Sequence, residues 1–258
     1  MYKIGILLFF FIIGCKKESP KSNKLVAPKT EKKMGIDDIE WMTEEYPPYN
    51  FGDENGVNQG IAVEYLKAMF KGSDKDIQLL PWARGYKLVQ TKGKYNCLFS
   101  MTRTEERENL FKWFGPISNT QVYVEGPKNG KKINSKEELK NYTYSVIRGG
   151  ISPIRLKTFG VPESNMNPVA NIKQMYMMLK NKKVDFMAYE WNVINWSMKK
   201  LGFDPTKIEK KYLLKDGKLW FACNKSVSDE IIQKLQNIFN TIKNKEEVKT
   251  VLKSKYGL

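Results

Sequence analysis

The chain has 258 residues, of which 41% are apolar and 28% are charged, so it can bury a sizeable core and is not disordered as a whole. It contains no histidine, which excludes catalysis by serine–histidine or cysteine–histidine pairs, histidine general bases and most catalytic zinc sites. The formal net charge is +16, but seven lysines lie between Lys16 and Lys33 and most others are scattered beside acids, which argues against a nucleic-acid partner.

The first fifteen residues have the pattern of an export signal. Lys3 precedes an apolar run from Ile4 to Ile13, which is too short to span a bilayer, and Gly14-Cys15 follows. This pattern resembles a bacterial lipoprotein signal, which implies removal of residues 1–14 and lipidation of Cys15. The alternative is an ordinary signal peptide with a chance cysteine.

Residues 15–35 are rich in lysine, serine and proline and have almost nothing to bury, which predicts a flexible tether. We expect the rest of the chain to lie outside the cytoplasm, in the periplasm or on the cell surface. The lipid on Cys15 would hold it to the membrane.

From Ile36 onward, short apolar runs alternate with helical patterns, which predicts an α/β fold with largely parallel sheets. The first set of predicted elements comprises a strand over 36–42, a loop over 43–51 whose two prolines exclude a helix, a helix with Ala62, Tyr65, Leu66 and Met69 on one face that ends at Gly72, a strand over 77–80, a helix over 82–90 and a strand over 95–101.

A second set of elements begins at Val122–Glu125. It comprises a capping box of Ser135 with Glu138, a strand over 143–147, a helix opened by Ser152 with Pro153 at its first position, a helix over 172–179, a strand over 184–189, a helix over 192–201, a strand over 219–223 and a long C-terminal helix capped from Ser228.

The three cysteines, Cys15, Cys97 and Cys223, lack metal-ligand spacing, and an odd count defines no disulfide framework. Cys97 and Cys223 both lie in apolar strand patterns, so we interpret them as buried free thiols. Whether the two pair stays open. We expect no metal ion and no cofactor.

The densest chemical segment runs from Phe99 to Arg107. A strand that ends in hydroxyl residues and then presents an arginine gathers hydroxyls, backbone N–H groups and a guanidinium fork, which suits a carboxylate. The alternative is a surface turn in which Arg103 or Arg107 pairs with Glu105, Glu106 or Glu108.

Residues 36–258 resemble the family 3 extracellular solute-binding proteins, the polar amino-acid binding proteins of ABC importers. The motifs that carry the resemblance are the loop Thr43–Phe51, Gly60 before the first helix, Met101–Arg107, the strand Val184–Met187, the closing strand Leu219–Lys225, and the branch markers Pro81–Arg84 and Lys112–Ile117.

The resemblance implies a two-lobed periplasmic-binding-protein fold of type II, in which each lobe is a mixed sheet flanked by helices. Lobe 1 would comprise residues 36–120 and 221–258, and lobe 2 residues 121–220.

By position in the family, the carboxylate-binding arginine falls on Arg107, with Thr102 and Ser100 beside it. The family's acid for the ligand ammonium falls on Glu190. A basic side chain of the family is displaced to Arg148, and the Gly149-Gly150 turn after it could offer N–H groups to an anion.

A family aspartate falls at Thr43, a departure that weakens the amino-acid assignment. Whether Glu44 or Glu45 replaces it stays open.

Aromatic residues cluster in the same segments: Tyr46, Tyr49, Phe51, Trp82, Trp113 and Trp191. Such rings supply contact area at low entropic cost, and we expect Tyr46, Tyr49 and Trp82 to line the pocket. Arg84 lies either in the cleft or on the surface.

Taken together, the sequence predicts a lipid-anchored, monomeric receptor that captures a small carboxylate-bearing ligand, with an amino acid as the favoured class, and delivers it to an ABC permease. It predicts no catalytic residues. The alternatives are an enzyme on the same fold, such as a small-carboxylate dehydratase, and a ligand-sensing lipoprotein without a transporter.

Overall fold

The computed structural model describes residues 34–72 and 75–256. From Gly35 onward the described residues form one compact unit. The predicted signal, Cys15 and residues 16–33 lie outside the described residues. Within the part of the chain that is described, no helix combines the length and the apolar character needed to cross a membrane.

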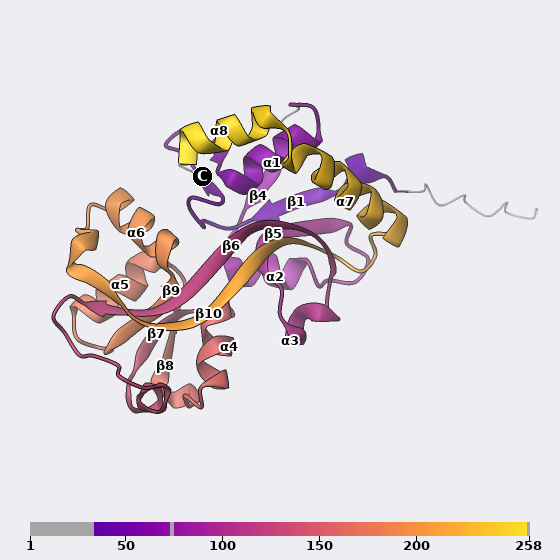
Figure 1. Ribbon diagram of the computed structural model, residues 1–258. Coiled ribbons are helices and arrows are strands. Elements are labelled where there is room, and N and C mark those ends of the chain that lie inside the picture. The colour runs from indigo at the N-terminus through magenta and orange to yellow at the C-terminus, as the bar shows by residue number, and fades with distance from the viewer. Residues whose placement is uncertain (1–33, 73–74, 257–258) are drawn as a thin grey trace, which may run out of the picture. The chain divides into compact units, whose positions relative to one another are not determined.

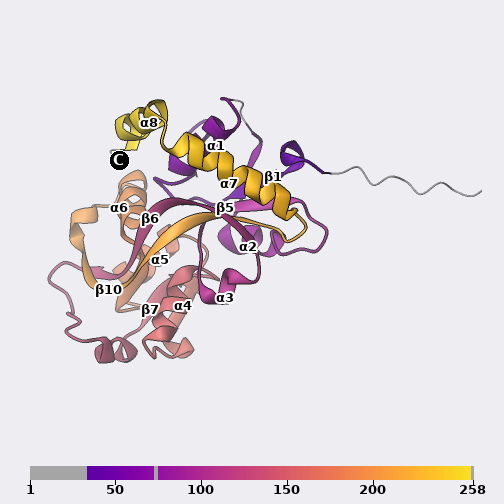
Figure 2. The ribbon, with the colours of Figure 1, turned by 45° about the vertical axis from the view of Figure 1, so that its right-hand side comes forward.

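One eight-stranded mixed sheet organises the unit, in the order β4-β1-β5-β10-β6-β9-β7-β8 (Figure 1). At one end, β4 (Ile77–Leu79), β1 (Glu40–Thr43) and β5 (Asn96–Thr102) are parallel, and at the other end so are β9 (Phe186–Glu190), β7 (Tyr144–Ile147) and β8 (Met166–Val169). The two ends are connected by β6 (Lys112–Pro127) and β10 (Ile208–Cys223), which pair antiparallel with each other. β10 also pairs antiparallel with β5, and β6 pairs antiparallel with β9. Figures 1 and 2 show these two strands running side by side between the two ends.

Helices cover both ends of the sheet. At the β1 end lie α1 (Ile61–Met69), α2 (Trp82–Leu88), the short α3 (Glu105–Glu108), α7 (Asp229–Lys243) and α8 (Glu246–Tyr256), and at the β7 end lie α4 (Ile151–Thr158), α5 (Ile172–Lys180) and α6 (Trp191–Lys200). The remaining pieces are the hairpin of β2 (Phe51–Gly52) with β3 (Asn58–Gln59) and the 3₁₀ turns η1 (Ile36–Asp38), η2 (Lys136–Asn141), η3 (Glu163–Asn165) and η4 (Pro205–Lys207).

Aromatic residues dominate the core at the β1 end. Phe114 of β6 and Phe221 of β10 stack with ring centroids 4.4 Å apart, and Trp41 of β1 meets both rings edge-on. A separate buried cluster at the β7 end contains Tyr144 and Phe186. The cluster that contains the aromatic stack also extends into the β7 end, through Tyr189 of β9 and Val193 of α6, so the two ends share a continuous core beside this separate cluster.

Gly60, just before α1, shows why the loop over 43–51 is held in place. Its φ of 121° is open to glycine, and an added Cβ would lie 2.4 Å from the Tyr49 carbonyl oxygen. The Gly60 N–H also donates to the Tyr256 hydroxyl at 2.9 Å. This close approach fixes Tyr46 and Tyr49 against the start of α1, beside the site described below.

Most predicted elements are confirmed within a few residues, including the Ser228 cap, which accepts from the Ile231 N–H. Four details were wrong. The first strand was predicted from residue 36, but residues 36–38 form a 3₁₀ turn before β1. The helix predicted to open at Ser152 is α4, which begins at Ile151, so Ser152 and Pro153 are its second and third residues. The Ser135 cap does not form, since Glu138 accepts from the Asn134 N–H instead. The sequence pattern also marked only short pieces of β6 and β10.

The interpretation of Cys97 and Cys223 as free thiols was wrong. They form a disulfide between β5 and β10, where the two residues are directly paired in the antiparallel register. A sequence separation of 126 residues hides this contact, because β10 returns to pair with a strand far behind it in the chain. The bond ties the C-terminal end of a crossing strand to the β1 end of the sheet.

We predict that the full chain carrying Cys15→Ser, unfolded without reductant, exposes no titratable thiol. Replacing both Cys97 and Cys223 by alanine should lower the free energy of unfolding by about 2–5 kcal/mol, because the crosslink closes a long loop. Thiol titration and thermal unfolding check this. Two free thiols in the oxidised protein would show that the bond does not form.

Candidate functional site

The loops at the carboxyl ends of the parallel strands converge between the two ends of the sheet. The loops that follow β1, β4 and β5 come from one side, and those that follow β7, β8 and β9 come from the other. In open α/β sheets ligands bind at this edge. Two adjacent cavities lie there.

Arg107 is the chemical centre of this region. Its side chain lies on α3 and is only 2% exposed. Nη1 donates to the Thr102 carbonyl oxygen at 3.2 Å and Nη2 to the Gly149 carbonyl oxygen at 3.3 Å, while Nε has no partner. The guanidinium carbon lies 5.3 Å from the ring centroid of Trp82 and 5.2 Å from that of Tyr86. No ion pair from another described residue reaches it.

The smaller cavity, of about 20 Å³, lies against Arg107. Its lining residues are Glu44, Tyr46, Trp82, Ser100, Thr102, Arg107, Gly150, Ile151 and Tyr189. The buried Ser100 hydroxyl has no hydrogen-bond partner, and Ser100 has a φ of 62°, a conformation that non-glycine residues adopt mainly at strained or functional positions. The cavity has room for about one water molecule and is lined by unsatisfied donors.

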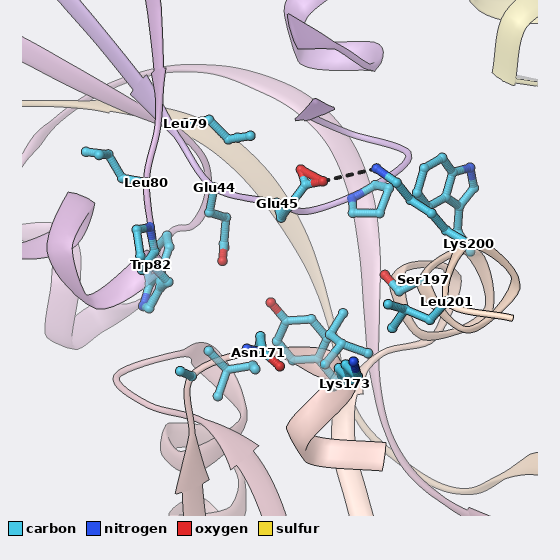
Figure 3. Close-up of a pocket in the computed structure, with 17 residues that line it drawn as sticks. Glu44, Glu45, Leu79, Leu80, Trp82, Asn171, Lys173, Ser197, Lys200 and Leu201 are labelled. Atoms are coloured by element: carbon cyan, nitrogen blue, oxygen red, sulfur yellow. Dashed lines mark hydrogen bonds and ion pairs between the residues drawn. The ribbon is translucent and has the colours of Figure 1, made fainter. Parts of the chain in front are cut away.

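The larger cavity, of about 690 Å³, opens beyond it (Figure 3). Glu44, Trp82 and Tyr189 line both cavities, so the two are adjacent. The other lining residues are mostly apolar and come from both sides: Pro47, Leu79, Leu80, Pro81, Ile147, Ala170, Ile172, Trp196 and Leu201, together with Glu45, Asn171, Lys173, Ser197 and Lys200. Glu45 and Lys200 form an ion pair of 3.3 Å across it.

Glu44 lies at the junction of the two cavities. Burial raises the pKa of its carboxyl to about 8, an effect that Arg107 opposes and Glu45 reinforces. Among the described residues, no hydrogen bond or ion pair to its carboxyl oxygens is present. Burial therefore favours the neutral acid form of the Glu44 carboxyl.

Glu190 is fully buried and lines neither cavity. Its carboxylate accepts from the Val193 N–H at 2.8 Å, capping α6, and from the Asn192 amide at 3.1 Å and the Tyr49 hydroxyl at 3.4 Å. Burial raises its pKa to about 7, against the hydrogen bonds that favour the charged form. These contacts hold the start of α6 and connect it to the loop after β1.

Of the other predicted site residues, Tyr46 and Trp82 line a cavity, whereas Tyr49 and Arg148 do not. Tyr46 lines the smaller cavity and stacks on Tyr49, with ring centroids 5.4 Å apart, while Tyr49 lines neither cavity. The Trp82 indole donates to the Gly149 carbonyl oxygen at 2.7 Å. Arg148 is exposed and lines neither cavity.

Three further positions are settled by geometry. Arg84 is exposed and lines neither cavity, and Thr43 is buried with its hydroxyl directed at the Phe99 carbonyl oxygen. On sequence grounds the Gly149-Gly150 turn was considered as a source of N–H donors for an anion. In the structure the Gly149 carbonyl oxygen faces the site, and it accepts hydrogen bonds from Trp82 and Arg107.

Sequence analysis missed Tyr189, Tyr86 and Trp196. Tyr189 could have been found from its place at the end of a predicted strand, next to Glu190. Tyr86 and Trp196 lie on helix faces, where spacing does not distinguish a cavity wall from a core contact. No group of three or more acidic or thiol side chains in the described ranges is arranged to hold a metal ion.

Residues 39–257 match the bacterial extracellular solute-binding proteins, family 3, and the chain belongs to this family. No curated protein matches the chain. The predicted family is confirmed, and so is the capacity to bind a solute that defines it.

Solved structures support the predicted periplasmic-binding-protein fold. A histidine kinase sensor domain with similarity to periplasmic binding proteins superposes with a TM-score of 0.75 at 15% identity, covering 85% of this chain and 96% of that one. An ancestral arginine-binding protein bound to arginine gives 0.70 at 20% identity, with 84% and 98% covered. The substrate-binding protein of an amino acid ABC transporter gives 0.70 at 17% identity, with 85% and 100% covered.

We predict that Glu44→Gln makes the folded protein more stable than the wild type at pH 8.5 and equally stable at pH 4. The Glu44 pKa of about 8 exceeds its ordinary value of 4.5, so the folded chain holds a proton that the unfolded chain releases, and wild-type stability falls across this window as pH rises. The mutant lacks this penalty and should gain a few degrees in melting temperature at pH 8.5.

Thermal unfolding at both pH values checks the prediction. Glu40→Gln, at an exposed position of β1, is the matched control and should change neither melting temperature appreciably. A Glu44→Gln protein that is no more stable than the wild type at pH 8.5 would contradict the assignment.

Proposed function

We propose that this protein is a monomeric receptor outside the cytoplasm that binds a small carboxylate-bearing metabolite, an amino acid, between two hinged lobes and delivers it to an ABC permease. The observation that carries the proposal is the burial of Arg107 without a carboxylate partner. Taking a guanidinium out of water is costly unless an anion or a full set of acceptors compensates it. A ligand carboxylate is the missing partner.

The smaller cavity supplies the rest of a carboxylate site. The planar Arg107 fork can give a carboxylate two parallel hydrogen bonds, and the unpartnered Ser100 hydroxyl can donate a third. The Trp82 and Tyr86 rings beside the guanidinium keep water away from it. A family of binding proteins needs no catalytic group here, and we assign none.

Ligand entry requires the two sides to separate, because about 20 Å³ is too little for an amino acid carboxylate and its substituents. Residues 36–120 with 221–258 would form one lobe and residues 121–220 the other, connected through β6 and β10. Hydrogen bonds from Trp82 and Arg107 to the Gly149 carbonyl connect the two sides. A ligand that contacts both sides shifts the population towards closure, which the permease would recognise.

We predict that Arg107→Lys lowers the affinity for the amino acid at least ten-fold, because lysine keeps the charge but loses the bidentate fork. Thermal shift across a panel of amino acids, dicarboxylates, amines and small peptides finds the ligand. A ligand at about 100 times its Kd adds about 2.7 kcal/mol to the free energy of unfolding. Titration then compares the variants.

Arg84→Ala on α2 serves as the control, since that side chain is exposed and lines neither cavity. Unchanged affinity in Arg107→Lys and in Arg107→Ala would remove the proposed carboxylate site.

The lipid anchor is a second part of the proposal. The lipobox-like Ile12–Cys15 implies a diacylated cysteine at the new N-terminus and a tether to the folded unit. We predict that Cys15→Ser abolishes labelling by radioactive palmitate in a bacterial host and moves the protein out of the membrane fraction. Equal labelling of the mutant would contradict lipidation at Cys15.

A further inference from the structure

Glu44 occupies a position that no other described acid shares, because it is the one acidic residue lining both cavities. Figure 3 shows its carboxyl directed from the loop after β1 into the open space between the two sides. A ligand whose carboxylate lies against Arg107 must pass its next atoms beside Glu44 before it reaches the larger cavity.

Glu190 is poorly placed for the same task. Its two carboxylate oxygens already receive hydrogen bonds from Val193, Asn192 and Tyr49, and it lines neither cavity. A ligand ammonium could reach it only by displacing the cap of α6. The carboxyl of Glu44 has no such engagement.

We propose that the ligand is an amino acid with a bulky apolar side chain, whose ammonium group binds Glu44 and whose side chain fills the larger cavity. This inference rests on the proposed function, since it assumes that Arg107 holds the ligand carboxylate. It names the ligand class and assigns to Glu44 the role that family position gives to Glu190.

The walls of the larger cavity favour an apolar occupant. Leucine, isoleucine, proline and tryptophan side chains come from both sides, and Leu79 and Leu201 are exposed at 38% and 40%. Exposed leucines beside a concave site gain free energy when an apolar group covers them. Glu45 and Lys200 neutralise each other, and Lys173 is exposed to solvent. About 690 Å³ is within the range of pockets for small organic ligands and exceeds what a short polar side chain fills.

Charge complementarity supports the same orientation. Arg107 and Glu44 both line the smaller cavity and interact electrostatically. An amino acid carries a carboxylate and an ammonium group on the same carbon, so its site needs a positive and a negative group this close together. In the free protein burial raises the pKa of Glu44 to about 8, and a bound ammonium would favour the carboxylate form. Binding at pH 7 should therefore release a proton.

Isothermal titration of the full chain tests the proposal with ligands that differ in one group at a time. Alanine, valine, leucine and phenylalanine vary the apolar side chain, glutamine, glutamate and arginine replace it by polar groups, and 3-phenylpropionate removes the ammonium from phenylalanine. We expect affinity to rise about four-fold per buried methylene along the apolar series. Phenylalanine should bind at least ten-fold more tightly than glutamine.

Glu44→Gln tests the ammonium site against its matched control, Glu40→Gln. We expect Glu44→Gln to lower the affinity for phenylalanine about ten-fold or more and to leave that for 3-phenylpropionate within two-fold, since a hydrogen bond to a charged group is lost only with the amino acid. The comparison of phenylalanine with 3-phenylpropionate on the unmodified chain gives the same information if the variant misfolds.

The outcomes separate this inference from the proposed function. Tighter binding of glutamine, glutamate or arginine than of phenylalanine, with dependence on Arg107, would overturn the apolar side chain and leave the carboxylate site standing. Equal binding of phenylalanine and 3-phenylpropionate would overturn the role of Glu44. A chain that binds none of these carboxylates would overturn both proposals.

Discussion

The buried guanidinium of Arg107 determines how the rest of the site is arranged. It is held by the carbonyl of Thr102 on its own side and by the carbonyl of Gly149 on the other, so the same side chain joins the two ends of the sheet. These carbonyl oxygens accept hydrogen bonds from two of its nitrogens without neutralising its charge, and Nε has no partner. Burial lowers the pKa of Arg107, and the nearby Glu44 favours its charged form without forming an ion pair. An anion that replaced the Gly149 carbonyl would neutralise the guanidinium charge, so this exchange is electrostatically favourable.

The two long strands provide the mechanical setting for that exchange. In the sheet, β6 and β10 are the connection between the parallel strands at each end, and register shifts interrupt their pairing at several points. The Cys97–Cys223 bond and the aromatic stack of Phe114 on Phe221 fix these strands at the β1 end. Pairing is regular from Lys215 to Leu219, and the shifts lie on either side of this stretch. Bending at these shifts would move the Gly149 turn relative to Arg107.

The sequence predicted most of the fold because its elements carry local signals: apolar runs, helical stripes and caps such as Ser228. It missed the extent of β6 and β10 because the lysine-rich residues 208–218 have no apolar alternation, and only pairing with a neighbouring strand makes them extended. The Cys97–Cys223 bond was missed because the pairing of two strands 126 residues apart leaves no local signal. At the site, Arg107, Ser100 and Thr102, chosen by position within the family, line the smaller cavity, and their role in ligand binding stays a prediction. Family position could not distinguish Glu44 from Glu190, because which of the two acids is already hydrogen-bonded depends on side chains from distant loops.

The most direct test of the account is a crystal structure of the protein grown with the amino acid that gives the largest thermal shift. The account predicts a ligand carboxylate oxygen about 2.8 Å from the Arg107 guanidinium nitrogens, in place of the Gly149 carbonyl, and an enlarged smaller cavity. A ligand bound elsewhere, with Arg107 still donating to the Gly149 carbonyl, would contradict it.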